Sequence, residues 1–135
     1  MFVRPVEYVD FNGKKKTKDC YFNLNESEII EMEVGVSGGF HDMLDKAIKS
    51  EDGKTLMALF KDLILKSYGV KSADGERFEK SEEISTAFYQ TNVYNALFME
   101  LVFDAKKAAE FVNALFPKDL LDALMEKVEA SINKQ

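Results

Sequence analysis

Apolar and polar residues alternate along the first 24 positions of the chain. Cys20, Phe22 and Leu24 are separated by polar or aromatic residues, and an earlier alternating stretch ends at the Asn12-Gly13 pair. Two such stretches around Asn-Gly predict a β-hairpin. Because side chains alternate between the two faces of a strand, we expect Cys20, Phe22 and Leu24 on the covered face. A lone hairpin is marginal in water, so it must pack on helices, add a third strand or pair with another copy.

From residue 25 onward the apolar positions follow a helical period. Asn25, Ser81, Thr91 and Asp104 each precede an apolar run and can cap a helix with their side chains. Glu28 lies three residues after Asn25, as in a capping box. The predicted apolar stripes are Ile29, Ile30 and Met32; Phe40, Met43, Leu44, Ala47 and Ile48; Leu56, Phe60, Leu63 and Ile64; Ala108, Phe111, Val112 and Leu115; and Leu120, Leu121, Leu124, Met125 and Val128.

Turn and break residues separate these helices. Glycines at 35, 38 and 39 end the first helix, Gly69 is expected to close the third, residues 72–75 (SADG) predict a turn, and Pro117 marks the start of the last helix. The expected fold is α+β, an N-terminal β-hairpin followed by a bundle of about six or seven short α-helices. We expect a single domain over residues 1–135, with the hairpin in 1–24 and the helical body in 25–133.

The helix predicted after Thr91 is apolar around almost its whole circumference. Such a helix must be buried on most sides, and its surplus of apolar surface suits a protein that holds another chain. Tyr94, Phe98, Met99 and Phe103 are the candidate partner-binding residues. The alternative is that these side chains belong to the chain's own core, as apolar stripes usually do.

Methionines elsewhere in the chain extend this hypothesis. Met57 and Met125, like Met99, have flexible side chains that would suit a surface accepting several registers of a partner. A helical partner with an apolar stripe could lie in a groove made of such side chains.

Charge and hydropathy exclude two classes of partner. The formal net charge is −6, and the one basic cluster, Lys14, Lys15, Lys16 and Lys18, follows the predicted hairpin turn, where solvated lysines are common. We therefore expect no nucleic-acid partner. No apolar run reaches the roughly 20 residues needed to cross a bilayer, and the first residues lack the apolar segment of a signal peptide. We expect a soluble, cytosolic protein without a membrane partner.

The residues that could perform chemistry are few and scattered. Cys20 is the single cysteine and lies in a predicted strand, where a small buried apolar residue is expected, and His41 is the single histidine. The glycines near residue 38 lack the lysine and hydroxyl residue of a phosphate-binding loop. No pair of carboxylates is selected by its spacing. We predict no enzyme, no metal site and no cofactor.

Taken in order, segments along most of the chain resemble the tail assembly chaperones of long-tailed, siphovirus-type bacteriophages. Each segment alone can be explained as a cap, a turn or a core face, so the resemblance depends on their order. The segments are residues 9–13 (VDFNG), 21–26 (YFNLNE), 38–39 (GG), 61–69 (KDLILKSYG), 74–78 (DGERF), 80–82 (KSE), 88–91 (FYQT), 94–101 (YNALFMEL) and 108–113 (AAEFVN), ending at Pro117.

The resemblance implies a protein that acts in the cytoplasm of the infected bacterium and is absent from the mature virion. Such chaperones bind the long, helical, aggregation-prone tape measure protein and help to recruit subunits of the major tail tube protein. Self-association is a further expectation, because the hairpin edge could pair with another copy. The alternative hypothesis is a small acidic phage regulator or adaptor that binds a host protein.

Overall fold

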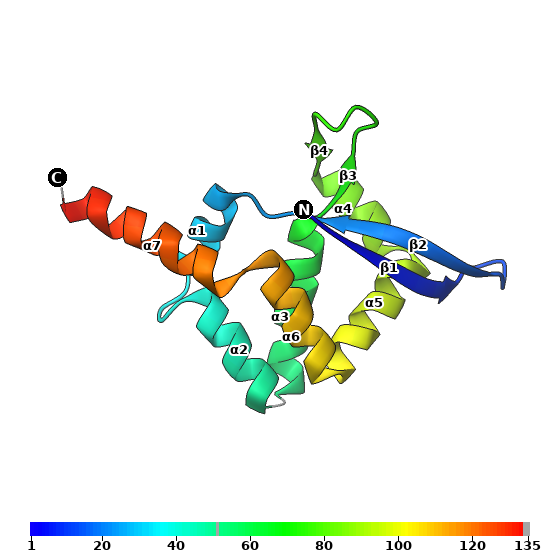
Figure 1. Ribbon diagram of the computed structural model, residues 1–135. Coiled ribbons are helices and arrows are strands. Elements are labelled where there is room, and N and C mark those ends of the chain that lie inside the picture. The colour runs from blue at the N-terminus through cyan, green and yellow to red at the C-terminus, as the bar shows by residue number, and fades with distance from the viewer. Residues whose placement is uncertain (51, 134–135) are drawn as a thin grey trace.

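The computed structural model describes residues 1–50 and 52–133, and in this part of the chain it contains seven helices and four strands (Figure 1). The predicted α+β class, with an N-terminal hairpin followed by helices, is confirmed. The elements are β1 (Phe2–Val9), β2 (Lys15–Phe22), α1 (Glu26–Val34), α2 (Phe40–Ser50), α3 (Gly53–Ser67), β3 (Tyr68–Lys71), β4 (Phe78–Glu79), α4 (Glu82–Tyr89), α5 (Asn92–Phe103), α6 (Ala105–Leu115) and α7 (Lys118–Asn133).

The N-terminal hairpin has the predicted phase. Strands β1 and β2 pair antiparallel, with Phe2 opposite Phe22, and Cys20, Phe22 and Leu24 are buried as expected. In the turn, one Asp10 carboxylate oxygen accepts hydrogen bonds from the backbone N–H groups of residues 12 and 14, and Gly13 has a φ of 81°, a conformation that favours glycine. Residues 11–19 are exposed on both faces, so the far end of the hairpin projects from the helical body.

A second hairpin extends the sheet, and the sequence patterns did not predict it. Strand β3 pairs antiparallel with β2, β4 pairs with β3, and the four strands lie in the order β1-β2-β3-β4. The prediction that Gly69 closes the third helix is wrong, because α3 ends at Ser67 and Gly69 lies in β3. A Cβ at Gly69 would lie 2.5 Å from the Phe78 ring, so this glycine allows the second hairpin to close. The turn predicted at residues 72–75 joins these strands.

The predicted helix caps are confirmed. Asn25 and Glu28 form a capping box at α1, and the side chains of Ser81, Thr91 and Asp104 accept backbone hydrogen bonds at the starts of α4, α5 and α6. Pro117 immediately precedes α7 and its carbonyl accepts from Leu121 N–H, so the proline comes one residue before the helix instead of inside its first turn.

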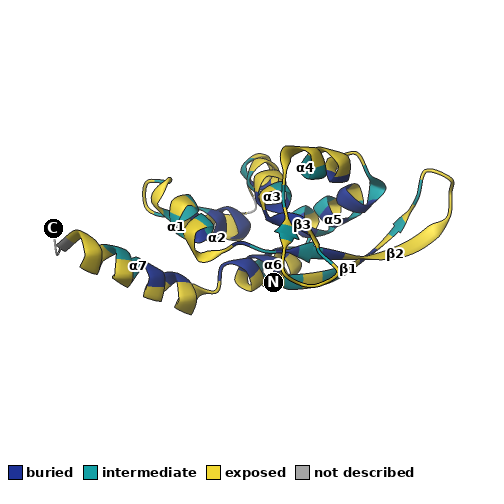
Figure 2. Cartoon of the chain, turned by 90° about the horizontal axis from the view of Figure 1, so that it is seen from above, coloured by how far each residue is buried: buried dark blue, intermediate teal, exposed yellow. Residues whose placement is uncertain are grey.

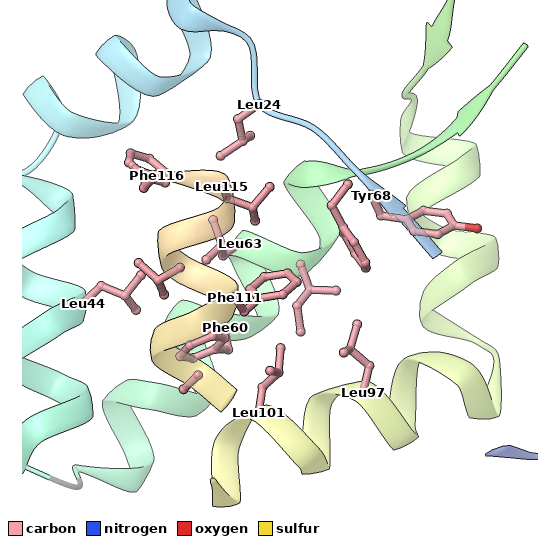
Figure 3. Packing of buried hydrophobic residues seen from close by; sticks show 14 of the residues in the cluster. Leu24, Leu44, Phe60, Leu63, Tyr68, Leu97, Leu101, Phe111, Leu115 and Phe116 are labelled. Atoms are coloured by element: carbon pink, nitrogen blue, oxygen red, sulfur yellow. The ribbon is translucent and has the colours of Figure 1, made fainter. Parts of the chain in front are cut away.

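The core lies where α3, α5 and α6 meet the covered face of the hairpin (Figure 3). Phe111 of α6 is at its centre and has ring centroids 5.8 Å from Phe2, 5.2 Å from Phe22 and 6.3 Å from Phe60. Leu97 and Leu101 of α5 point into the same cluster. The hairpin and the helices therefore share one apolar core.

Two parts of the molecule extend beyond this core. Figures 1 and 2 show the far end of the hairpin and the C-terminal half of α7 projecting in opposite directions, and both are mostly exposed. The third exposed feature is the outer side of α5, which carries the candidate site.

Candidate partner-binding groove

Helix α5 is covered over most of its circumference and open along one stripe. Val93, Leu97 and Leu101 are buried, whereas 47% of Met99 and 77% of Phe103 is exposed. The prediction that this helix is covered on most sides is confirmed, because its exposed residues, Asn95, Met99 and Phe103, form one stripe and the others are buried or half-buried. The open side keeps two large apolar residues one helical turn apart, so they lie on the same face of the helix.

The four predicted partner-binding residues divide between the core and the surface. Tyr94 is buried, with its ring 5.9 Å from that of Phe88 and 5.7 Å from that of Phe98. Burial raises the pKa of the Tyr94 hydroxyl to about 12. Phe98 is half-buried and stacks on Tyr94, while Met99 and Phe103 are exposed. The structure thus leaves Met99 and Phe103 accessible to a partner and places Tyr94 beneath Phe98.

Beside Phe103, an apolar groove with a volume of about 320 Å³ separates the start of α3 from the junction of α5 and α6. The exposed side chains of Phe103 and Met57, 49% of which is exposed, stand at its rim, and the buried side chains of Leu56 and Leu101 form its base. Among the described residues, none that lines the groove is charged. The lining residues are Ile48, Gly53, Leu56, Met57, Leu101, Val102, Phe103, Ala105 and Ala108.

The local sequence explains why the groove stays open. Asp104 ends α5 and starts α6, because its carboxylate accepts hydrogen bonds from the backbone N–H groups of Lys106 and Lys107, and the chain changes direction there. The side chains that follow, Ala105 and Ala108, are too small to fill the space beside Phe103. Gly53, which opens α3 on the opposite wall, contributes no side chain.

Ion pairs next to the groove fix the wall formed by α5 and α6. The Glu100 carboxylate of α5 accepts from Arg4 Nη2 of β1 at 2.6 Å and lies 2.9 Å from Lys107 Nζ of α6. The Glu100 carboxylate raises the pKa of Lys107. Farther along α3, outside the groove, Lys61 Nζ lies 4.7 Å from the centroid of the Tyr89 ring, which links α3 to α4.

The sequence patterns missed most of the groove. Met57 and Met99 were predicted as adaptable contacts, and both are half-exposed; Met125, predicted with them, lies partly buried on α7. Ile48 and Leu56 belong to apolar stripes that the sequence assigns to the core, and their position in the groove depends on how α2 and α3 pack against α6. No local pattern carries that information.

The remaining chemistry-bearing residues do not converge on this groove. Burial raises the pKa of the Cys20 thiol to about 11, so this thiol stays protonated at neutral pH. The His41 ring lies 6.4 Å from that of Phe116, away from the groove. Within residues 1–50 and 52–133, no three His, Cys, Asp or Glu residues are grouped so that they could hold a metal ion. The groove's own chemistry is the burial of apolar side chains.

In the described ranges, no helix has both the length and the apolar character needed to cross a membrane.

A comparison with protein-family models gives one match that spans the chain. The model describes a phage tail assembly chaperone and covers residues 1–135. No curated protein and no solved structure matches the chain.

Proposed function

Because the chain belongs to the phage tail assembly chaperone family, we propose that it binds the tape measure protein through the apolar groove beside Phe103 and helps to recruit tail tube subunits. The observation that carries this proposal is a hollow whose described lining residues are uncharged, with exposed Phe103 and Met57 at its rim. Exposed apolar surface beside a concave site is typical of a protein-binding surface. The resemblance identified in the sequence names the two partners.

The groove suits an amphipathic helix of a partner. A tape measure helix presents apolar side chains every three or four residues, and one of them can enter the hollow while Phe103 packs beside it. Each square ångström of apolar surface removed from water stabilises the complex by roughly 25 cal/mol. Met57 and Met99 can change rotamer to fit different side chains, so one groove can accept several segments of a long partner.

The proposed action requires no catalysis. Binding masks apolar helix surface by mass action, which keeps the tape measure protein from aggregating. Release then follows when tube subunits polymerise on the tape measure and compete for the same surface. This work takes place in the cytoplasm of the infected bacterium, and the chaperone leaves before the virion is complete.

The decisive experiment co-expresses the chain with the tape measure protein of its phage and measures how much tape measure protein stays soluble. We expect a clear gain with the native chain and little gain with Phe103→Ser. The matched control is Phe11→Ser, because Phe11 is 78% exposed at the hairpin tip, outside the groove. The proposal is wrong if the native chain gives no gain, or if both serine variants behave alike.

A second experiment tests recruitment and release. Purified complex of the chain and the tape measure protein is mixed with tube subunits in the absence of nucleotide. We expect tube polymerisation with loss of the chain from the product. A requirement for ATP would contradict release by competition.

A further inference from the structure

The open stripe of α5 contains one polar position. Asn95, Met99 and Phe103 are the exposed residues of this helix, and each is four positions from the next, so they form one ridge along it. At 1.5 Å per residue the ridge is about 12 Å long, a little more than two helical turns. Because Phe103 stands at the rim of the groove, the ridge and the groove make one continuous surface.

The other amide and carboxylate side chains of α5 are used by the fold. Asn92 Nδ2 donates to the Val9 carbonyl at 2.9 Å, and the Glu100 carboxylate pairs with Arg4. The hydrogen bonds of Asn95 within the described residues involve its backbone alone, as in the bond from its N–H to a carbonyl one turn earlier at 3.4 Å. Its side-chain amide therefore keeps one acceptor and two donors for water or for a partner.

We propose that Asn95 sets the register of the helix that docks on α5, through hydrogen bonds to an asparagine, glutamine, serine or threonine side chain of that helix. This inference rests on the proposed function, because one tape measure helix occupies both the groove and the ridge. It gives the partner a sequence pattern. An apolar residue enters the hollow beside Phe103, and a neutral polar residue lies seven or eight positions away, about two helical turns along.

The physical reason is the cost of covering an amide. When a helix lies on the ridge, the Asn95 side chain loses its water, and a leucine opposite it leaves the donors and the acceptor unpaired. An amide or hydroxyl opposite it replaces the lost hydrogen bonds, so the site rejects leucine at that point and accepts a polar residue. A single asparagine in the seam between two packed helices fixes their register in this way.

Register selection matters for a long helical partner. Met57 and Met99 adapt to different apolar side chains, so apolar contact alone would hold such a helix in many registers. Asn95 admits only the registers that place a polar group opposite it. The surface therefore tolerates different shapes at Met99 and requires a hydrogen bond one turn away.

The test uses the full chain and two fluorescent peptides of about 22 residues, six helical turns, with the same leucine stripe. In one peptide the central stripe position is asparagine, so leucines lie on both sides of it and either orientation can bring it opposite Asn95. Fluorescence anisotropy gives the two dissociation constants. We expect the native chain to bind the asparagine peptide at least about threefold more tightly, although this peptide has less apolar surface.

Variants of the chain assign the preference to one side chain. Asn95→Leu should reverse it, so that the all-leucine peptide binds about tenfold more tightly than the asparagine peptide. The matched control is Asn113→Leu on α6, an exposed amide off the ridge, and it should keep the native preference. Phe103→Ser should weaken both peptides about tenfold or more, which assigns them to the proposed surface. Circular dichroism checks the fold of each variant.

The outcomes separate this inference from the proposed function. If Phe103→Ser weakens both peptides but the native and Asn95→Leu chains share one preference, the surface binds a helix and the role of Asn95 is wrong. The same conclusion follows if the native chain prefers the all-leucine peptide, or if Asn113→Leu reverses the preference. If neither peptide binds, or if Phe103→Ser leaves both affinities unchanged, the proposed groove is wrong and the inference is wrong with it.

Discussion

Mutations at two nearby positions of α5 should distinguish an effect on folding from an effect on partner binding. Leu101 and Phe103 both line the groove and are two positions apart, yet Leu101 is fully buried and 77% of Phe103 is exposed. We predict that Leu101→Ala mainly reduces stability and that Phe103→Ala mainly reduces partner binding. The pair is informative because the two variants change the same helix in the same hollow.

The expected sizes follow from burial. Truncating a fully buried leucine costs about 2–5 kcal/mol, which for a chain of this length lowers the melting temperature by about 8–20 °C. Truncating an exposed side chain that makes few contacts changes the free energy of unfolding by about 0.5 kcal/mol or less. A phenylalanine side chain presents about 200 Å², so a partner can still cover about 150 Å² of Phe103, worth at most about 4 kcal/mol.

Part of that area remains exposed to solvent in the complex, and part of the binding free energy is lost in ordering the partner. We therefore expect Phe103→Ala to weaken binding by about 2 kcal/mol, or about 30-fold. Thermal unfolding followed by circular dichroism gives the stability of each variant. Titration calorimetry with a tape measure segment gives the affinity. If Phe103→Ala lowers the melting temperature as far as Leu101→Ala does, the open side of α5 is core and the reasoning fails.

Three further predictions test other parts of the structure. Burial raises the pKa of the Cys20 thiol from 9.0 to about 11 and that of the Tyr94 hydroxyl from 10.0 to about 12, so the unfolded chain loses these protons at lower pH than the folded chain does. The free energy of unfolding, measured with urea at several pH values, should therefore be constant below about pH 9 and fall between pH 9 and 12, and Tyr94→Phe should flatten the fall above pH 10. Glu100→Gln removes the carboxylate facing the largely covered Arg4 guanidinium and should cost about 1–3 kcal/mol in urea unfolding, and the matched exposed change Asp45→Asn should cost much less. Phe111→Ala at the centre of the aromatic cluster should cost about 3–5 kcal/mol, and unchanged stability would contradict its central place in the core.

Local rules accounted for the parts of the fold that depend on neighbours in sequence. The phase of β2 was predictable because burying Cys20 and Phe22 leaves only one register for the strand. The caps at Asn25 and Thr91 were predictable because the side chain and the N–H groups it binds are within three residues. The seven helices in the described part of the chain agree with the expected six or seven, because apolar stripes and caps are also local signals.

Strands β3 and β4 were beyond such rules. The second has two residues, and β3 is held by pairing with Phe22, far away in the chain. The sequence suggested that Gly69 ends a helix, because glycine often does. Its actual role is to allow the close approach of the Phe78 ring, and that contact forms only when both strands are paired. The groove was not predictable for the same reason. Ile48 and Leu56 belong to stripes typical of a core, and they line the groove only because of the way α2, α3 and α6 pack together.

The exposed side of α5 is better explained by binding than by stability. A polar residue at position 103 would cost the fold little, because the side chain there makes few contacts and stands at a helix end. Just behind it, Glu100 of α5 is ion-paired with Arg4 of β1 and Lys107 of α6, which fixes the position of the wall that carries Phe103. A rigid frame around an exposed aromatic residue lowers the conformational cost of docking, because the site is formed before the partner arrives. The chain therefore places rigidity and apolar exposure at the same point, which supports the proposed docking of a partner helix.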